Sequence, residues 1–164
     1  MRKLSKRVKL RLKYYDYSQN GLYFITICQK DMVCLFGSIS HDLMALNEAG
    51  EMLKIQWLQL TQRYGTLNLH EFVIMPNHFH AIIELREEST IQLSEIVGAF
   101  KSITTNAYIK GVKLYGWKRF DKQLWQRSFY DKIIRDNDFH HKVIEYIKYN
   151  PAKWCDDKYF KASS

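Results

Sequence analysis

The stretch Met75-Pro76-Asn77-His78-Phe79-His80-Ala81-Ile82-Ile83 decides the fold, because it joins a turn signal to an apolar run. The Pro-Asn pair favours a turn, and the β-branched residues that follow favour a strand. On a strand, side chains alternate between faces, so His78 and His80 lie on one face and Phe79 on the other. On a helix the two histidines would diverge by about 200°. Two imidazoles side by side can chelate a divalent cation, although half-buried structural histidines are the commoner case.

The composition is that of one basic globular domain. The 164 residues suffice for a single domain (1–164) with its own core, and 46% hydrophobic residues exclude disorder. The net charge of +8 predicts an acidic partner, with nucleic acid as the first candidate. The cysteines are odd in number and form no C-x-x-C pair, which argues against disulfides and zinc knuckles and fits a cytoplasmic protein. No apolar stretch approaches the length of a membrane span, so we expect no membrane association.

Basic residues gather in two places. Residues 1–15 are predicted to form an arm that lies along phosphates, and a solvated terminus is the alternative. Residues 110–122 hold two glycines, Gly111 and Gly116, and five cationic residues, and they are predicted to form an exposed basic loop. The candidate DNA-binding residues are Lys9, Arg11, Lys13, Lys118, Arg119 and Arg127. For the last three a merely solvated face is an equal alternative.

Hydrophobic periodicity predicts elements in the order β-α-β-β-α-β-α. The expected strands are residues 22–28, 67–75, 78–85 and 124–134, and the expected helices are residues 47–64, 93–109 and 139–149. A loop containing Gly37 and Ser38 joins the first strand to the first helix. Residues 75–77 are short enough for a hairpin, so the second and third strands should be antiparallel. This order predicts an α+β, ferredoxin-like fold: a four-stranded antiparallel sheet, two helices on one face and an extra C-terminal helix.

The last predicted helix carries a polar pair, Tyr146 and Asn150, four residues apart on one face. They border the side that packs inward, where polar groups need partners. One explanation is structural, with the tyrosine ring in the core and Asn150 as a helix C-cap. The other is that the pair belongs to a site shared with His78 and His80.

On these residues the chain resembles the single-tyrosine HUH transposases, where HUH stands for histidine-hydrophobic-histidine. It is most similar to the REP-associated tyrosine transposases and their insertion-sequence relatives. The resemblance covers nearly the whole chain. Its blocks are Tyr15-Asp16-Tyr17-Ser18-Gln19 leading into residues 24–28, Val73 to His80, Gly98-Ala99-Phe100-Lys101-Ser102, Leu124 to Asp131, Ile134-Arg135, and Tyr146-Ile147-x-x-Asn150-Pro151.

The resemblance implies roles for the four polar residues. Tyr146 would be the nucleophile, and His78 and His80 would bind a divalent cation with the amide oxygen of Asn150 as a third ligand. Many insertion-sequence members carry Gln where Asn150 stands, so this chain has the shorter amide. Imidazole and oxygen ligands suit Mg²⁺ or Mn²⁺. The implied activity is metal-dependent cleavage and strand transfer of single-stranded DNA next to a hairpin, through a 5′-phosphotyrosine intermediate.

Several alternatives stay open. Tyr149 or Tyr130 is a rival nucleophile. A non-catalytic, nucleic-acid-binding ferredoxin-like module is the rival from another class, and an HUH replication initiator or relaxase ranks third. The resemblance is compatible with a homodimer or with a monomer.

Overall fold

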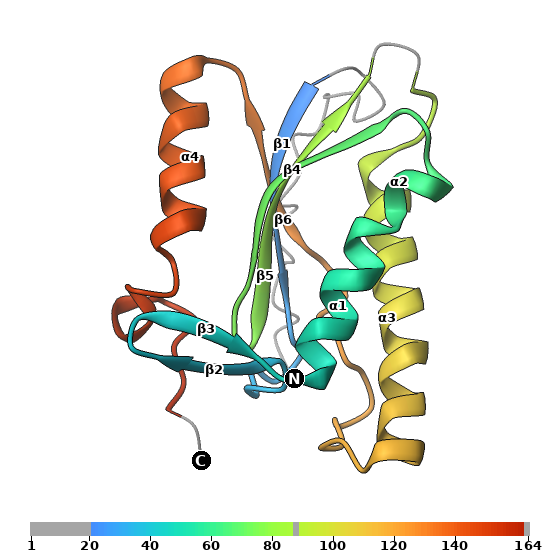
Figure 1. Ribbon diagram of the computed structural model, residues 1–164. Coiled ribbons are helices and arrows are strands. Elements are labelled where there is room, and N and C mark those ends of the chain that lie inside the picture. Colours follow the sequence, from blue (N-terminus) through green and yellow to red (C-terminus); the bar gives the residue numbers. More distant parts are fainter. Residues whose placement is uncertain (1–20, 87–88, 163–164) are drawn as a thin grey trace, which may run out of the picture.

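A four-stranded antiparallel sheet is the frame of the molecule (Figure 1). The computed structural model describes residues 21–86 and 89–162, so the predicted basic arm with Lys9, Arg11 and Lys13 lies outside the described residues. The strand order is β4-β5-β1-β6, where β1 is Gly21–Cys28, β4 is Leu67–Ile74, β5 is His78–Leu85 and β6 is Tyr130–Ile134. β4 and β5 pair antiparallel across the 75–77 turn, as predicted.

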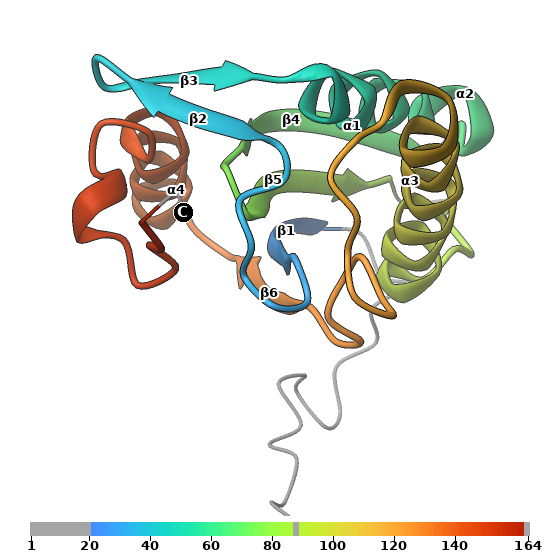
Figure 2. The same ribbon diagram turned by 90° about the horizontal axis from the view of Figure 1, so that it is seen from below.

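Three helices cover one face of this sheet: α1 (Glu48–Leu58), α2 (Leu60–Arg63) and α3 (Leu93–Tyr115) (Figures 1 and 2). Alternate residues of β1 and β5 point into this layer and form the main core with the helices. Phe79 is fully buried there, with its ring centroid 4.6 Å from that of Trp57 and 5.4 Å from that of Phe100. The middle residue of the His-Phe-His triplet is therefore a core residue.

The fourth helix, α4 (Asn137–Tyr149), lies on the opposite face of the sheet (Figure 2). Asp136 caps its first turn by accepting a hydrogen bond from the Phe139 amide at 2.7 Å. Val143 and Ile147 pack on Ile82 and Ile134 of the sheet, which makes a second, smaller core.

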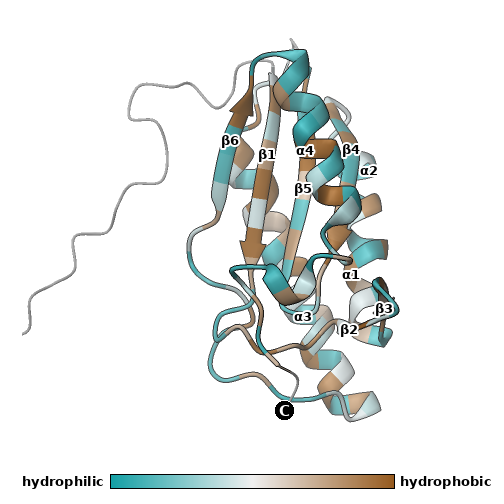
Figure 3. Cartoon of the chain, turned by 90° about the vertical axis from the view of Figure 1, so that its left-hand side faces the viewer, coloured by the Kyte–Doolittle hydropathy of each residue, from teal (hydrophilic) through white to brown (hydrophobic). Residues whose placement is uncertain are grey.

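The side view shows α4 in front of β5 and β4, with β1 and β6 beside it (Figure 3). The 3₁₀ turn η1 (Trp154–Asp156) follows α4. The ring of Trp154 lies 6.0 Å from that of His78, so the chain returns to the start of β5. The ferredoxin-like α+β fold with an extra C-terminal helix is confirmed.

The prediction of a basic loop over residues 110–122 is wrong in its first part, because α3 continues to Tyr115. Gly111, which suggested a loop, instead allows a close contact. A Cβ there would lie 2.1 Å from the ring of Trp117, which folds back on the helix. Gly116 then ends the helix in the left-handed region, with φ of 69°.

The predicted strand over residues 124–134 is confirmed only for Tyr130–Ile134. Before β6, Trp125 forms one isolated antiparallel bridge with Gln29, just past the end of β1. The Lys101 ammonium also holds this segment, donating to the carbonyls of Gln126 and Ser128 at 2.8 and 3.1 Å. The backbone pairing with the β1 side is therefore interrupted between Gln126 and Tyr130.

The loop predicted around Gly37 is a hairpin of β2 (Gly37–Ser40) and β3 (Leu43–Leu46). Its turn residues, His41 and Asp42, have φ of 50° and 61°. Such a turn is usually signalled by Asn-Gly or Asp-Gly, and neither dipeptide is present here. Among the described residues no helix is long and apolar enough to cross a membrane.

Candidate active site

His78 and His80 lie on the α4 side of the sheet, as the alternation along β5 predicts. In the antiparallel register His78 is opposite Cys28 and His80 is opposite Thr26. Both histidines are almost fully buried, and their ring centroids are 4.6 Å apart. One central strand thus presents two imidazoles to the same small volume.

Asn77 fixes the tautomer of His78. The Asn77 amide nitrogen donates to the carbonyls of Met32 and Tyr159 at 2.9 and 2.8 Å, so its amide oxygen is the atom 2.8 Å from His78 Nδ1. An amide oxygen only accepts, so Nδ1 carries the hydrogen. In neutral His78 this leaves the lone pair on Nε2, which has no hydrogen-bond partner among the described residues. This is the state in which histidine binds a metal.

Burial keeps both imidazoles neutral. It lowers the pKa of His78 to about 3, against a smaller opposing contribution from Asn150. It also lowers the pKa of His80 well below the usual value, and repulsion from a protonated His78 and from the Lys158 ammonium adds to the shift. His80 is further positioned by Thr26, whose hydroxyl lies 2.8 Å from its Nδ1.

Tyr146 and Asn150 reach these histidines from α4, as the sequence predicted. The Tyr146 hydroxyl lies 3.4 Å from His80 Nε2, with the two ring centroids 5.1 Å apart. Asn150 is buried at the end of the helix, and its amide oxygen has no hydrogen-bond partner among the described residues.

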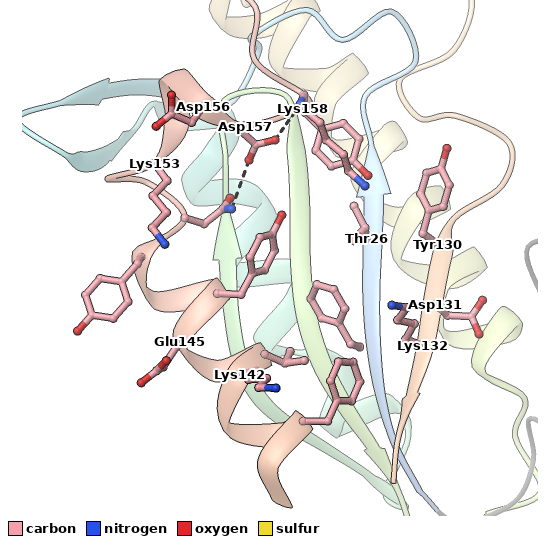
Figure 4. Close-up of a pocket in the computed structure, with 17 residues that line it drawn as sticks. Thr26, Tyr130, Asp131, Lys132, Lys142, Glu145, Lys153, Asp156, Asp157 and Lys158 are labelled. Carbon is pink, nitrogen blue, oxygen red and sulfur yellow. Dashed lines mark hydrogen bonds between the residues drawn. The ribbon is translucent and has the colours of Figure 1, made fainter. Parts of the chain in front are cut away.

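Asp157 is a component that sequence reasoning missed. It follows η1 (Figure 4). Its carboxylate lies 3.7 Å from His78 Nε2 and accepts a hydrogen bond from the Asn150 amide nitrogen at 3.3 Å. One ligand atom each from His78, His80 and Asp157 lies within 4.8 Å of the others. The only available signal was an acidic residue seven positions beyond Asn150. The predicted helix ends before Pro151, so helical periodicity does not extend to Asp157.

These groups form a donor set that fits a divalent cation. Two neutral imidazoles, a carboxylate and an amide oxygen converge. Two of the atoms, His78 Nε2 and Asn150 Oδ1, are buried and have no hydrogen-bond partner within residues 21–86 and 89–162. Unpartnered buried polar atoms are costly, and a bound cation would satisfy both.

The phenol of Tyr146 is neutral in this environment. Burial raises its pKa, and the negative charge of Asp157 raises it further, while Asn150 opposes the shift. A nearby positive charge would be needed to favour phenolate.

The other candidate residues lie elsewhere. Lys118 and Arg119 are exposed just beyond α3, and Arg127 is exposed in the segment before β6. None of these three lines the cavity at the histidine pair. Tyr130 and Tyr149, the rival nucleophiles, line the rim of that cavity and are 40% and 48% exposed.

The fold and the site together define a class: a ferredoxin-like domain that sets a tyrosine on a C-terminal helix against a His-x-His pair on a central strand. This is the class of the single-tyrosine HUH transposases. The family model described as "Transposase IS200 like" matches residues 47–150, and the chain belongs to this family.

Two curated relatives come from Haemophilus influenzae. An uncharacterized protein is 35% identical over 167 residues, covering 94% of this chain and 93% of that protein. A protein named "Putative REP-associated tyrosine transposase" is 27% identical over 141 residues, covering 84% of this chain and 74% of that one.

Two solved structures share the fold. A REP-associated tyrosine transposase bound to a REP hairpin superposes with a TM-score of 0.64 at 21% identity, over 87% of this chain and 74% of that one. A transposase from Deinococcus radiodurans, described as putative, gives a TM-score of 0.53 at 16% identity, over 84% of this chain and 95% of that one.

Proposed function

We propose that this chain cleaves and rejoins single-stranded DNA beside a hairpin, in a metal-dependent reaction through a 5′-phosphotyrosine intermediate. The observation that carries the proposal is the 3.4 Å approach of the Tyr146 hydroxyl to His80 Nε2. Beside it lie two buried candidate ligand atoms that have no hydrogen-bond partner in the described part of the chain. A tyrosine with only a structural role does not require its hydroxyl to lie beside a pair of candidate metal ligands.

His78, His80 and Asn150 would hold the cation, and Asp157 stands where it can join or orient them. Imidazole and oxygen donors suit Mg²⁺ or Mn²⁺. When bound, the cation would polarise the scissile phosphate and favour ionisation of the phenol. The remaining functions fall to the side chains of this chain.

Tyr146 would attack the phosphorus through its phenol oxygen. A bond from that oxygen to phosphorus forms, and the bond from phosphorus to the 3′ oxygen breaks. The phenol proton is lost, and the departing 3′ oxygen gains a proton to become a free hydroxyl. One phosphodiester is exchanged for another, so the step needs no ATP and runs in reverse to join a new 3′ end.

The proposed partner is single-stranded DNA that carries a hairpin. The support is family membership together with the solved relative that is bound to a REP hairpin. Tyr146 reaches the histidines of its own chain, which supports a site made within one subunit. Oligomeric state is a separate matter, and both a monomer and a dimer accommodate such a site.

A covalent-adduct assay tests the proposal. A labelled library of hairpins with single-stranded arms is incubated with Mg²⁺ or Mn²⁺ and separated on denaturing gels. We expect a protein-linked product that Tyr146→Phe and His78→Ala abolish and that Tyr149→Phe, a matched change on the same helix, leaves intact. Binding without an adduct in either metal would favour the non-catalytic module. An adduct that survives Tyr146→Phe would assign the nucleophile to another tyrosine.

A further inference from the structure

A cavity of about 970 Å³ opens beside the histidine pair, between α4 on one side and β1 and β6 on the other (Figure 4). Phe24 and Thr26 of β1 contribute to its lining, together with Tyr130 and Lys132 of β6 and Phe139 of α4. Pockets of roughly 300–1,000 Å³ hold organic ligands of drug size. The cavity is therefore much larger than a cation and one phosphate oxygen require.

The cavity is continuous with the candidate active site through Phe24. The Phe24 ring stacks on His80 at a centroid distance of 5.4 Å and meets the edge of Tyr146 at 5.9 Å. A strand whose phosphate lies at Tyr146 and His80 would place a neighbouring nucleotide against Phe24.

The lining matches the two halves of a nucleotide. Phe24, Phe139 and Val143 present apolar surface, on which the face of an unpaired base can stack. Lys132 and Lys142 also line the cavity, from β6 and α4 respectively, and can contact phosphates. The Lys132 ammonium already lies over the Phe139 ring, 5.8 Å from its centroid.

The acidic residues that line the cavity lie away from Lys132 and Lys142, so they do not neutralise these lysines at the end of the cavity formed by Phe24 and Phe139. Asp131 is opposite Ile25, a residue of the main core, so its side chain leaves on the other face of the sheet. Figure 4 shows Asp131 and Glu145 on the outer sides of β6 and α4. Asp156 and Asp157 lie at the other end of the cavity, after α4, and Asp157 is beside His78.

We propose that this cavity holds the unpaired base of the nucleotide next to the scissile phosphate. Phe24 and Phe139 contact the base, and Lys132 and Lys142 contact the adjoining backbone phosphates. The inference rests on the proposed function, and it adds that the nucleotide at the cut is recognised by a protein pocket and not only through the hairpin.

The first test uses a hairpin oligonucleotide whose cut position the adduct assay has mapped. 2-Aminopurine replaces the nucleotide on either side of the cut, and binding is measured with the Tyr146→Phe protein so that the strand stays whole. Stacking on a ring quenches 2-aminopurine, so we expect quenching at one flanking position and none at a control position within the arm. An abasic nucleotide at the quenched position should bind about tenfold more weakly. Phe139→Leu, which keeps apolar packing but removes the ring, should lose most of that discrimination.

The second test compares two exposed lysines of α4. Lys142 lines the cavity and Lys148 does not, so Lys142→Ala and Lys148→Ala make the same charge change in different places. Each phosphate contact to a single strand adds about 0.7 to the slope of log affinity against log salt. We expect Lys142→Ala and Lys132→Ala each to reduce the slope by about that amount and Lys148→Ala to leave it unchanged.

The outcomes separate the two proposals. An adduct that forms normally, with equal affinity for abasic and intact strands and no quenching on either side of the cut, overturns the nucleotide pocket alone. Equal salt slopes for Lys142→Ala and Lys148→Ala do the same, and this comparison stands even if Phe139→Leu folds poorly. Absence of any adduct removes the proposed function and the pocket with it.

Discussion

Replacing Asp157 tests how a cation would be held. The Asp157 carboxylate lies 3.7 Å from His78 Nε2 and accepts the Asn150 amide at 3.3 Å. It thus supplies negative charge beside one ligand atom, and it fixes the Asn150 amide so that Oδ1 remains free for a cation. Asp157→Asn removes the charge but keeps an oxygen that can accept the Asn150 amide. Asp157→Ala removes both.

The expected change in the Kd for Mn²⁺ follows from these two roles of the Asp157 carboxylate. Loss of a partner that orients a ligand typically weakens metal binding about 10- to 100-fold. We expect Asp157→Asn to raise the Kd for Mn²⁺ about tenfold and Asp157→Ala to raise it about 100-fold, because the alanine variant also releases the Asn150 amide.

Titration calorimetry, or the electron paramagnetic resonance signal of free Mn²⁺, measures the Kd without any DNA. Asp156→Asn is the matched control, because Asp156 is the exposed neighbour of Asp157 and this substitution removes the same charge as Asp157→Asn. If Asp157→Ala binds Mn²⁺ within twofold of the unmodified protein, Asp157 neither binds nor orients, and the reasoning from the two distances fails.

Three further predictions concern the fold and the thiols. Phe79→Ala should lower the free energy of unfolding by about 3–5 kcal/mol in urea titrations, because a fully buried ring is lost; a change under 1 kcal/mol would contradict its core role. Gly111→Ala should destabilise by about 1–3 kcal/mol despite the better helix propensity of alanine, since its Cβ would meet the Trp117 ring, and an increase in stability would refute that contact. Burial raises the pKa of Cys28 to about 11, so iodoacetamide at pH 8 should modify exposed Cys155 first and Cys28 only after unfolding, as peptide mass mapping would show.

The residues that could be predicted from sequence are those whose placement follows from a local period. Strand alternation placed His78 and His80 on one face, and the helical repeat placed Tyr146 and Asn150 together. Those four residues meet as expected, although their roles in catalysis and metal binding remain predictions. Asp157 could not be found this way, because only the return of the chain after α4 brings it to His78.

The fold shows the same division. The ferredoxin-like order could be predicted from hydrophobic patterns, which record burial. The β2–β3 hairpin could not, because His41 and Asp42 adopt a turn that their sequence does not signal. Gly111 led to the wrong prediction of a loop where α3 continues. A helical glycine that allows close packing of Trp117 cannot be distinguished in sequence from a glycine in a loop.

The alternation along β5 determines which substitutions in this strand would affect folding and which would affect only the candidate active site. Phe79 points into the main core, while His78 and His80 point to the opposite face of the sheet. Neighbouring positions of one strand therefore contribute to the core and to the candidate site in turn. A mutational scan across 78–81 should therefore alternate between substitutions at Phe79 and Ala81, which lower the amount of folded protein, and substitutions at the two histidines, which remove the candidate ligands. Under the proposed function, a copy that has lost one of these histidines would stay folded and compete with active copies for their DNA.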